Sequence, residues 1–402
     1  MSERGGATVS YFGVNEAYQL ALAAQEAGLL DAFYCSLYDA PGKWGGRLAA
    51  LLGRETLANR RCAGFNPADA IEIPWPFIGE RVKSLFRSPG NEPAWFKTSD
   101  AFDRRVAKRL ASSGSRVLVA TEMCALQSFR VARDKGMKRV LDCPQVHMDF
   151  LNRVLSDAAT DLGLSRSRQS DSDDVLSRKA KEYEMADKIL VFSDVHRRSF
   201  FEAGFSAERI VQIPLWVDAQ MWFPPQTPRD RNATGPLRVL FVGSLDLRKG
   251  VPYLLRAVED CGGQTQLTLA GADGGTLEEF FNRSTANVKR AGRKNKSELR
   301  ELYWQSDVLV LPSLVDSFGF VALEAMACGL PVIVTANCGA PVPSPDWRVP
   351  VMNSNAIASR LEHYAGDRDA LSRDGLTASS FARHFTPERY RAGIREVLAE
   401  LL

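Results

Sequence analysis

Short apolar runs alternate with amphipathic segments along the second half of the chain. A continuous apolar run predicts a buried parallel strand at 237–243, and further strands are predicted at 266–270, 307–311 and 331–335. Between these stretches, apolar positions at helical spacing predict helices over 251–258, 297–305 and 321–328. Gly329 and Pro331 follow the last helix in the order typical of a helix end. Repeated alternation of strand and helix predicts a doubly wound parallel sheet.

The first half of the chain alternates in the same way, with a less regular pattern. It predicts a helix over 17–27 and strands at 32–36, 116–120, 139–142, 188–192 and 209–213. Proline and polar residues then dominate, and we place an interdomain linker at 221–236. We therefore expect an α/β fold of two Rossmann-like doubly wound domains, 1–220 and 237–385, facing a cleft. A helix at 386–402 is expected to return toward the first domain.

Composition narrows the class of protein. The 402 residues are 45% hydrophobic, which is enough for two buried cores. The formal net charge of +3 is too small to indicate a nucleic-acid-binding protein, which would need a concentrated basic stripe. The seven cysteines contain no CxxC pair, which favours a reducing compartment. The N-terminus lacks an apolar signal region, so we expect a cytoplasmic protein, either soluble or peripheral at the inner face of a membrane.

A basic, amphipathic window covers residues 43–87. It mixes tryptophans and aliphatic residues with eight Lys and Arg residues against four acids. Such segments can lie on an anionic membrane surface. They can equally be helices that pack their apolar faces into the first domain, and the sequence leaves both interpretations open.

The segment 312–335 is the strongest candidate for chemistry. It predicts a strand, a loop, a helix and a second strand, so its loop lies at the carboxyl end of a parallel strand, where open α/β sheets bind ligands. Free N–H groups at a helix start attract phosphate or hydroxyl groups. Asp316 in the loop and Glu324 in the helix place two carboxylates there. Glu324 could accept hydrogen bonds from ribose hydroxyls, or be an ordinary solvent-facing acid.

A second candidate is the segment 242–255, VGSLDLRKGVPYLL. It predicts a strand, then a loop containing Arg248 and Lys249, then a glycine that opens a helix. Two cations beside a helix start are a plausible anion site, although such pairs are usually solvated surface.

Taken together, the two segments resemble retaining glycosyltransferase family 4. The carboxylate spacing, the Phe-Gly pair, LEAM and CGLP recur there in the same order as in 312–335. The resemblance implies the GT-B architecture and a nucleoside-diphosphate-sugar donor. It implies that Glu324 binds the donor ribose, that Lys249 contacts the diphosphate, and that Asp316 faces the transferred sugar. Asp316 stands where the family has glutamate, and Ser244 where many members have arginine, so Arg248 would supply the missing charge.

The resemblance extends, more weakly, over 182–218, although Trp216 stands there in place of a glycine. The donor-binding set that it implies is Gly13, Ser244, Arg248, Lys249, Arg293, Asp316, Ser317, Phe318, Gly319, Phe320 and Glu324.

The catalytic residues that we expect are His147, Asp316 and Lys249. His147 follows a predicted strand near the place of an active-site histidine in the family, and Asp142 is the alternative polar group of the first domain. His196 lies in a basic helix and is expected at the surface. Asp171 and Asp173 have the DxD spacing of metal-dependent sugar transferases but follow no strand, so we expect no metal site and no cofactor.

The expected reaction is metal-independent transfer of a hexose-type sugar to a hydroxyl of a glycan, a lipid-linked glycan or a small molecule, without a nucleic-acid partner. The family retains the anomeric configuration, and no protein nucleophile is evident, so attack from the face of the leaving group is expected. Two rivals stay open, a nucleotide-sugar 2-epimerase and a non-catalytic transferase subunit, because a fold alone decides neither.

Overall fold

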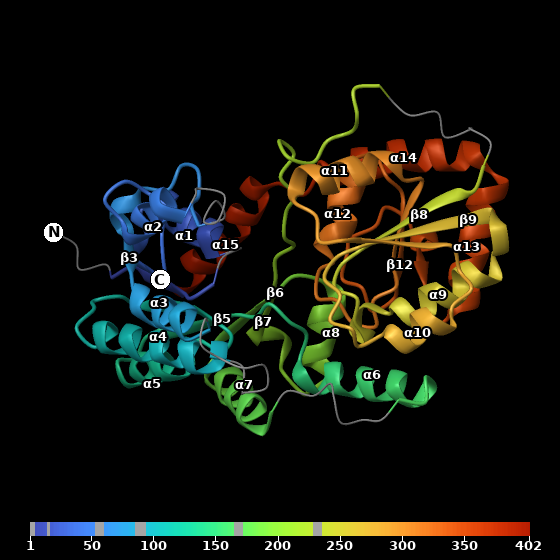
Figure 1. The fold of residues 1–402 in the computed structure, drawn as a ribbon. Helices are drawn as coiled ribbons and strands as arrows, with labels where there is room; N and C mark the ends of the chain where they lie inside the picture. Colours follow the sequence, from blue (N-terminus) through green and yellow to red (C-terminus); the bar gives the residue numbers. More distant parts are fainter. Residues whose placement is uncertain (1–4, 14–16, 53–59, 85–93, 165–171, 228–234) are drawn as a thin grey trace.

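The computed structural model describes residues 5–13, 17–52, 60–84, 94–164, 172–227 and 235–402. They form two parallel sheets, each flanked by helices (Figure 1). The first sheet has the order β3-β2-β1-β4-β5-β6-β7. Its strands are β1 Ala7–Tyr11, β2 Leu30–Cys35, β3 Ala70–Glu72, β4 Val117–Thr121, β5 Lys138–Asp142, β6 Lys188–Val191 and β7 Ile210–Gln212.

The second sheet has the order β10-β9-β8-β11-β12-β13, so its strand order reverses between β8 and β11. Its strands are β8 Leu237–Val242, β9 Thr265–Ala270, β10 Val288–Gly292, β11 Val308–Leu311, β12 Val332–Thr335 and β13 Arg348–Val349. Every paired strand in both sheets runs parallel to its neighbour. The prediction of two doubly wound α/β domains is therefore confirmed.

Helices cover both sheets because parallel strands must be buried on both faces. In the first half they are α1 Ala17–Glu26, α2 Trp44–Leu52, α3 Pro74–Ser84, α4 Ala94–Leu110, α5 Leu126–Asp134, α6 Met148–Asp161, α7 Asp173–Met185 and α8 Asp194–Glu202. In the second half they are α9 Val251–Asp260, α10 Glu278–Arg283, α11 Lys296–Gln305, α12 Phe320–Ala327, α13 Ser354–Gly366, α14 Arg368–Ala382 and α15 Pro387–Leu401.

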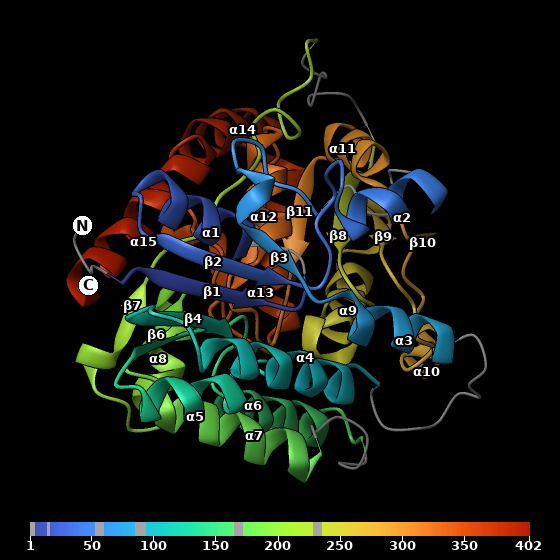
Figure 2. The same ribbon diagram turned by 90° about the vertical axis from the view of Figure 1, so that its left-hand side faces the viewer.

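The last helix, α15, crosses back to the first sheet. In Figures 1 and 2 it lies beside α1, although the two helices are near opposite ends of the sequence. Arg391 and Arg395 of α15 both donate to the Glu26 carboxylate of α1, at 3.0 and 2.8 Å. The first domain therefore contains structure from both ends of the chain.

The start of the predicted linker 221–236 is tied to the second domain. The Trp304 indole N–H of α11 donates to the Phe223 carbonyl at 2.8 Å, and Arg300 donates to the Met221 carbonyl at 3.1 Å. Trp222 is buried against Tyr303. Residues 228–234 of the linker lie outside the described residues, and the domain boundaries stay a prediction.

All seven cysteines are free thiols, and all are buried, as expected for side chains that pack like small apolar residues. Within the described ranges, none of the helices has the length and apolar content needed to cross a membrane.

Candidate active site

Two loops meet where the strand order of the second sheet reverses. One loop follows β8 and carries Lys249, and the other follows β11 and carries Asp316. The Lys249 Nζ lies 2.5 Å from Asp316 Oδ2, and both side chains are mostly buried. The loops are also joined through their backbones, because the Leu314 N–H donates to the Arg248 carbonyl at 2.8 Å. The structure thus brings together the two segments that the sequence singled out, at the place where doubly wound sheets bind ligands.

The Lys249 loop is a single 3-10 turn fixed at both ends. Asp246 caps the turn by accepting from the Lys249 N–H at 3.0 Å, and the Ser244 hydroxyl donates to the other Asp246 oxygen at 2.5 Å. Gly250 ends the turn with φ of 70° and begins α9. A Cβ atom at position 250 would overlap the Pro312 carbonyl oxygen, so only glycine fits there.

The Asp316 loop is ordered by its own carboxylate. Asp316 Oδ1 accepts from the Gly319 N–H at 2.9 Å and from the Phe318 N–H at 3.4 Å, while its other oxygen holds Lys249. Gly319 has φ of 68°, and a Cβ there would lie 2.8 Å from the Cys338 sulfur. Burial alone would raise the pKa of Asp316, but Lys249, Arg248 and the Gly319 N–H hold that pKa below its ordinary value. Asp316 is therefore a carboxylate at neutral pH.

Glu324 lies one turn into α12 and is half-buried rather than solvent-facing. Its Oε2 accepts from the Tyr303 hydroxyl of α11 at 3.0 Å. Burial raises the pKa of Glu324 to about 7, against smaller opposing effects of Tyr303 and Lys296. The interpretation of Glu324 as an ordinary surface acid does not fit this setting. Tyr303 has no signal in the sequence, because it is one of two adjacent aromatic residues in a helix that packs against a core.

The remaining residues of the predicted donor set lie at different distances from this pair. Ser317, Phe318, Gly319 and Phe320 form the turn from Asp316 into α12, and the Phe318 and Phe320 rings pack at 5.2 Å. Arg248 precedes Lys249 and donates to the Val315 carbonyl at 3.3 Å. Arg293 is exposed in the loop between β10 and α11. Gly13 lies in the first domain, just after β1. The roles of all these residues stay predictions.

The first domain touches the Asp316 loop at Ser317. The Ser317 hydroxyl donates to the Pro144 carbonyl at 2.7 Å, and the Ser193 hydroxyl donates to the Ser317 carbonyl at 2.6 Å. Pro144 follows β5 and Ser193 follows β6. The carboxyl ends of both sheets therefore face each other across the Asp316 loop.

His147 lies in an aromatic cluster of the first domain. Its ring centroid is 5.1 Å from that of Tyr183, 5.2 Å from Phe200 and 5.7 Å from Phe205. Its Nδ1 accepts from the Asp149 N–H at 3.3 Å and so caps α6, and burial lowers the pKa of the ring. These contacts give His147 a capping and packing role, and its catalytic role stays a prediction. Asp142, the alternative, is buried at the end of β5.

His196 is not at the surface, and that expectation was wrong. The ring is fully buried on the inner face of α8, where Nδ1 accepts from the Phe192 N–H at 3.2 Å. Burial lowers its pKa to about 3, so the ring is neutral. The charged neighbours Arg197 and Arg198 suggested an exposed helix, but they occupy its outer face and pair with Asp194 and Glu202.

The DxD pair falls at the edge of the described chain. Asp171 lies outside the described residues, and Asp173 begins α7 with an exposed side chain. In the part of the chain that the structure covers, no three His, Cys, Asp or Glu side chains gather in a way that could hold a metal ion.

Comparison with known proteins places this site in a family. Residues 225–361 match the family described as glycosyl transferases group 1. The chain is 32% identical to a D-inositol 3-phosphate glycosyltransferase of Corynebacterium jeikeium over 185 residues, which cover 39% of this chain and 43% of that protein. It is 36% identical to a glycogen synthase of Mycobacterium tuberculosis over 146 residues, 34% of each protein. These matches span less than half the length of the relatives.

Solved structures match over nearly the whole chain. A sucrose-phosphate synthase from Thermosynechococcus elongatus superimposes with a TM-score of 0.68 at 19% identity, covering 99% of both chains. The Anabaena protein HepE in complex with UDP-glucose gives a TM-score of 0.62 at 16% identity, covering 98% of this chain and 99% of that one. At such identities the likeness concerns the fold, which is the two-domain GT-B architecture. The residues that match the glycosyl transferases group 1 family, 225–361, are those that carry Lys249, Asp316 and Glu324.

Proposed function

We propose that this protein is a retaining, metal-independent glycosyltransferase that takes a hexose-type sugar from a nucleoside-diphosphate sugar. The observation that carries the proposal is the Lys249–Asp316 pair at the reversal point of the second sheet, with Glu324 one turn further along α12. In this proposal the cation and the helix start bind the diphosphate of the donor, and the carboxylate of Glu324 binds its ribose.

In this proposal the second domain holds the donor. The diphosphate lies against Lys249 and Arg248 and against the N–H groups that begin α12, and its growing negative charge is stabilised there as the anomeric bond breaks. Asp316 orients the transferred sugar and, through its ion pair, also positions the Lys249 ammonium. The departing phosphate then accepts the proton of the acceptor hydroxyl, which attacks from the same face.

A thermal-shift screen tests the donor class. Ligand binding raises the melting temperature by mass action, so UDP-, GDP-, ADP- and dTDP-sugars are compared at equal concentration. A UDP-sugar is the first choice because HepE, which shares the fold, was solved with UDP-glucose. If no nucleoside diphosphate or its sugar raises the melting temperature, the chain is better described as a non-catalytic subunit.

Glu324→Gln is expected to weaken binding of the nucleoside diphosphate by about 1–3 kcal/mol, because charged hydrogen bonds to the ribose are lost. The pKa of Glu324 near 7 adds a pH dependence. Above that pKa the carboxylate accepts two ribose O–H groups, and below it one acceptor is lost. Wild-type affinity should therefore fall as pH drops through about 7, by more than the affinity of Glu324→Gln falls.

Isothermal calorimetry with UDP between pH 5.5 and 8.5 measures this difference. The diphosphate also titrates in this range, but it contributes equally to both proteins, so only the difference reports on Glu324. Glu362→Gln, on the exposed side of α13 in the same domain, serves as the control. Equal affinities of wild type and Glu324→Gln at pH 8 would contradict the ribose role.

The window 43–87 has an inner face that packs into the first domain and an outer face that is exposed, so both the packing and the membrane interpretations stay open. Ala49 of α2 is buried against Leu37, so the inner face packs into the first domain. The outer face exposes Trp44, Leu51 and Trp75, which are 40, 79 and 58% exposed, and the two tryptophan rings pack at 5.5 Å. Helices α2 and α3 lie at one margin of the first domain in Figure 2. Residues 53–59 and 85–87 of the window lie outside the described residues.

We expect this outer face to contact an anionic membrane that presents a lipid-linked acceptor. Co-sedimentation with phosphatidylglycerol vesicles should be strong at low salt and weak at high salt, since each cation near the surface contributes about 1 kcal/mol. Trp44→Ser/Trp75→Ser should reduce it severalfold. Leu376→Ser removes a side chain of α14 that is 77% exposed on the other domain, and it should have no effect. Without sedimentation at low salt, a soluble acceptor becomes the better proposal.

A further inference from the structure

A cavity of about 250 Å³ opens at the carboxyl ends of β1, β4 and β5 in the first domain. Its lining includes Gly13 after β1, residues 121–124 after β4, Pro144 after β5, and Lys179 of α7. Pro144 is also the residue whose carbonyl accepts from Ser317 of the Asp316 loop. The cavity is therefore next to the proposed position of the transferred sugar, on the side that an acceptor would occupy.

One wall of the cavity is a turn with an unfavourable backbone. Met123 has φ of 70°, in the left-handed region that a methionine side chain disfavours, and it is nonetheless buried. The turn leads into α5, whose N-cap residue is Ala125. Alanine has no side-chain oxygen that could accept from the free N–H groups at the helix start. Both the turn and the helix start must be held from elsewhere.

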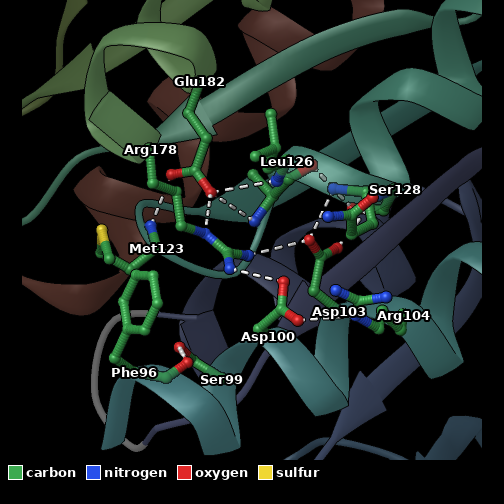
Figure 3. Close-up of polar contacts among 12 residues, drawn as sticks. Phe96, Ser99, Asp100, Asp103, Arg104, Met123, Leu126, Ser128, Arg178 and Glu182 are labelled. Atoms are coloured by element: carbon green, nitrogen blue, oxygen red, sulfur yellow. Dashed lines mark hydrogen bonds and ion pairs between the residues drawn. The ribbon is translucent and has the colours of Figure 1, made fainter. Parts of the chain in front are cut away.

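Glu182 of α7 supplies the missing acceptor (Figure 3). Its Oε2 accepts from the Met123 N–H at 2.6 Å, and its Oε1 accepts from the N–H groups of Ala125 and Leu126 at 3.1 and 3.0 Å. The Glu182 side chain is fully buried. A single carboxylate thus holds three N–H groups, one from the left-handed residue of the turn and two from the start of α5.

Arg178 and Asp103 keep that carboxylate in place. The Arg178 Nε donates to Glu182 Oε1 at 3.0 Å, and its Nη2 donates to Asp103 at 3.0 Å. Asp103 of α4 in turn accepts from the N–H groups of Gln127 and Ser128, at 2.7 and 3.0 Å. Arg178 also donates to Asp100 at the partly exposed end of the group, as Figure 3 shows. Side chains of two helices, α4 and α7, therefore hold one turn and the start of α5.

This arrangement is costly as a helix cap. Buried charges lose their hydration, and a buried ion pair is often no more stabilising than apolar residues of the same volume. A serine at position 125 would accept from the N–H group of Gln127 or Ser128, which Asp103 holds here, and from none of those that Glu182 holds. What the local cap cannot do is hold Met123, because the Met123 N–H precedes the helix.

We propose that Glu182, oriented by Arg178 and Asp103, is a positioning residue that fixes the shape of the acceptor side of the active site. The inference rests on the proposed function, since it concerns the acceptor of the same transfer reaction. Glu182 acts through the turn and not through the substrate. Because the donor loops belong to the second sheet, loss of Glu182 should alter acceptor recognition and leave donor binding intact.

Glu182→Gln is the variant that tests this. It keeps the size of the side chain, but its amide NH₂ faces N–H groups of the turn. Rates are measured with UDP-glucose as donor, with n-octyl glucoside as the acceptor probe and with water alone as the second acceptor. We expect KM for the glucoside to rise at least tenfold, while the dissociation constant for UDP and the rate of UDP-glucose hydrolysis stay within twofold of wild type.

A second variant separates positioning from stability. Ser128→Ala removes the hydroxyl that donates to the Ala125 carbonyl, so it weakens the start of α5 without touching the N–H groups that Glu182 holds. We expect it to lower the melting temperature and to leave KM for the glucoside within twofold of wild type. A rise of KM in Ser128→Ala as large as that in Glu182→Gln would show that KM follows the stability of the helix start, and it would overturn the proposal. Glu184→Gln, which changes an exposed acid of the same helix α7, is the control and should leave KM unchanged.

The proposed function and this inference fail in different ways. Absence of UDP binding and of hydrolysis in the wild-type protein would count against the glycosyltransferase itself. Normal UDP binding together with an unchanged KM for the glucoside in Glu182→Gln would refute the positioning role alone.

Discussion

Lys249→Ala is expected to lower turnover of the donor roughly 10²–10³-fold, the effect of losing one preorganised electrostatic contact at a transition state. The Lys249 ammonium lies 2.5 Å from Asp316, so this carboxylate fixes its position. Its charge would oppose the negative charge that develops on the leaving diphosphate. Because that charge is larger in the transition state than in the bound donor, turnover should fall more than donor affinity.

Loss of Lys249 also has a structural effect that must be measured separately. Asp316 would keep its hydrogen bonds to Gly319 and Phe318 but lose the cation that lowers its pKa. The melting temperature and UDP affinity of the variant therefore accompany the rate measurements. Lys138→Ala, which removes an exposed lysine at the amino end of β5, is the control and should leave turnover unchanged. Turnover of Lys249→Ala within threefold of wild type would remove Lys249 from the site.

The central strands were predictable because burial leaves a clear pattern. Strands β11 and β12 are buried at every position, and only Thr335 at the end of β12 interrupts their apolar sequences. The edge strand β10, Val288–Gly292, was not predicted. It carries Lys289 and Arg290 and is largely exposed, so it has no apolar run and no strict alternation. Strand β1 was missed for another reason, since its buried residues include the polar Thr8 and Ser10.

The donor side of the site was predictable from position along the strands. The carboxyl ends of neighbouring parallel strands lie at one edge of a sheet, so the loops after β8 and β11 had to be close. That Lys249 and Asp316 form a pair was not predictable, because loops of these lengths can take many conformations. The group formed by Asp103, Arg178 and Glu182 had no signal at all. Asp103 and Arg178 are 75 residues apart and lie on helices whose mutual orientation only the folded chain defines.

Gly250→Ala is expected to destabilise the second domain through both backbone strain and a steric overlap. Gly250 has φ of 70°, which costs an alanine about 1–3 kcal/mol in backbone strain. The new Cβ would also overlap the Pro312 carbonyl oxygen, and overpacking against rigid backbone costs typically about 1–3 kcal/mol more. Relief of this overlap must move the Lys249 turn away from the end of β11. A displacement of about 1 Å there can cost roughly 10²-fold in turnover.

Two other glycines of the same domain separate these causes. Gly262 has φ of 56° but open space around its Cβ position, so Gly262→Ala has the strain without the overlap. Gly263 also has open space and no left-handed backbone, so Gly263→Ala should change stability by no more than about 0.5 kcal/mol. Urea unfolding should rank the losses as Gly250→Ala above Gly262→Ala above Gly263→Ala, and only the first should lower turnover. Equal losses for Gly250→Ala and Gly262→Ala, with full turnover in both, would mean that contact between the β8 and β11 loops does not set the position of Lys249.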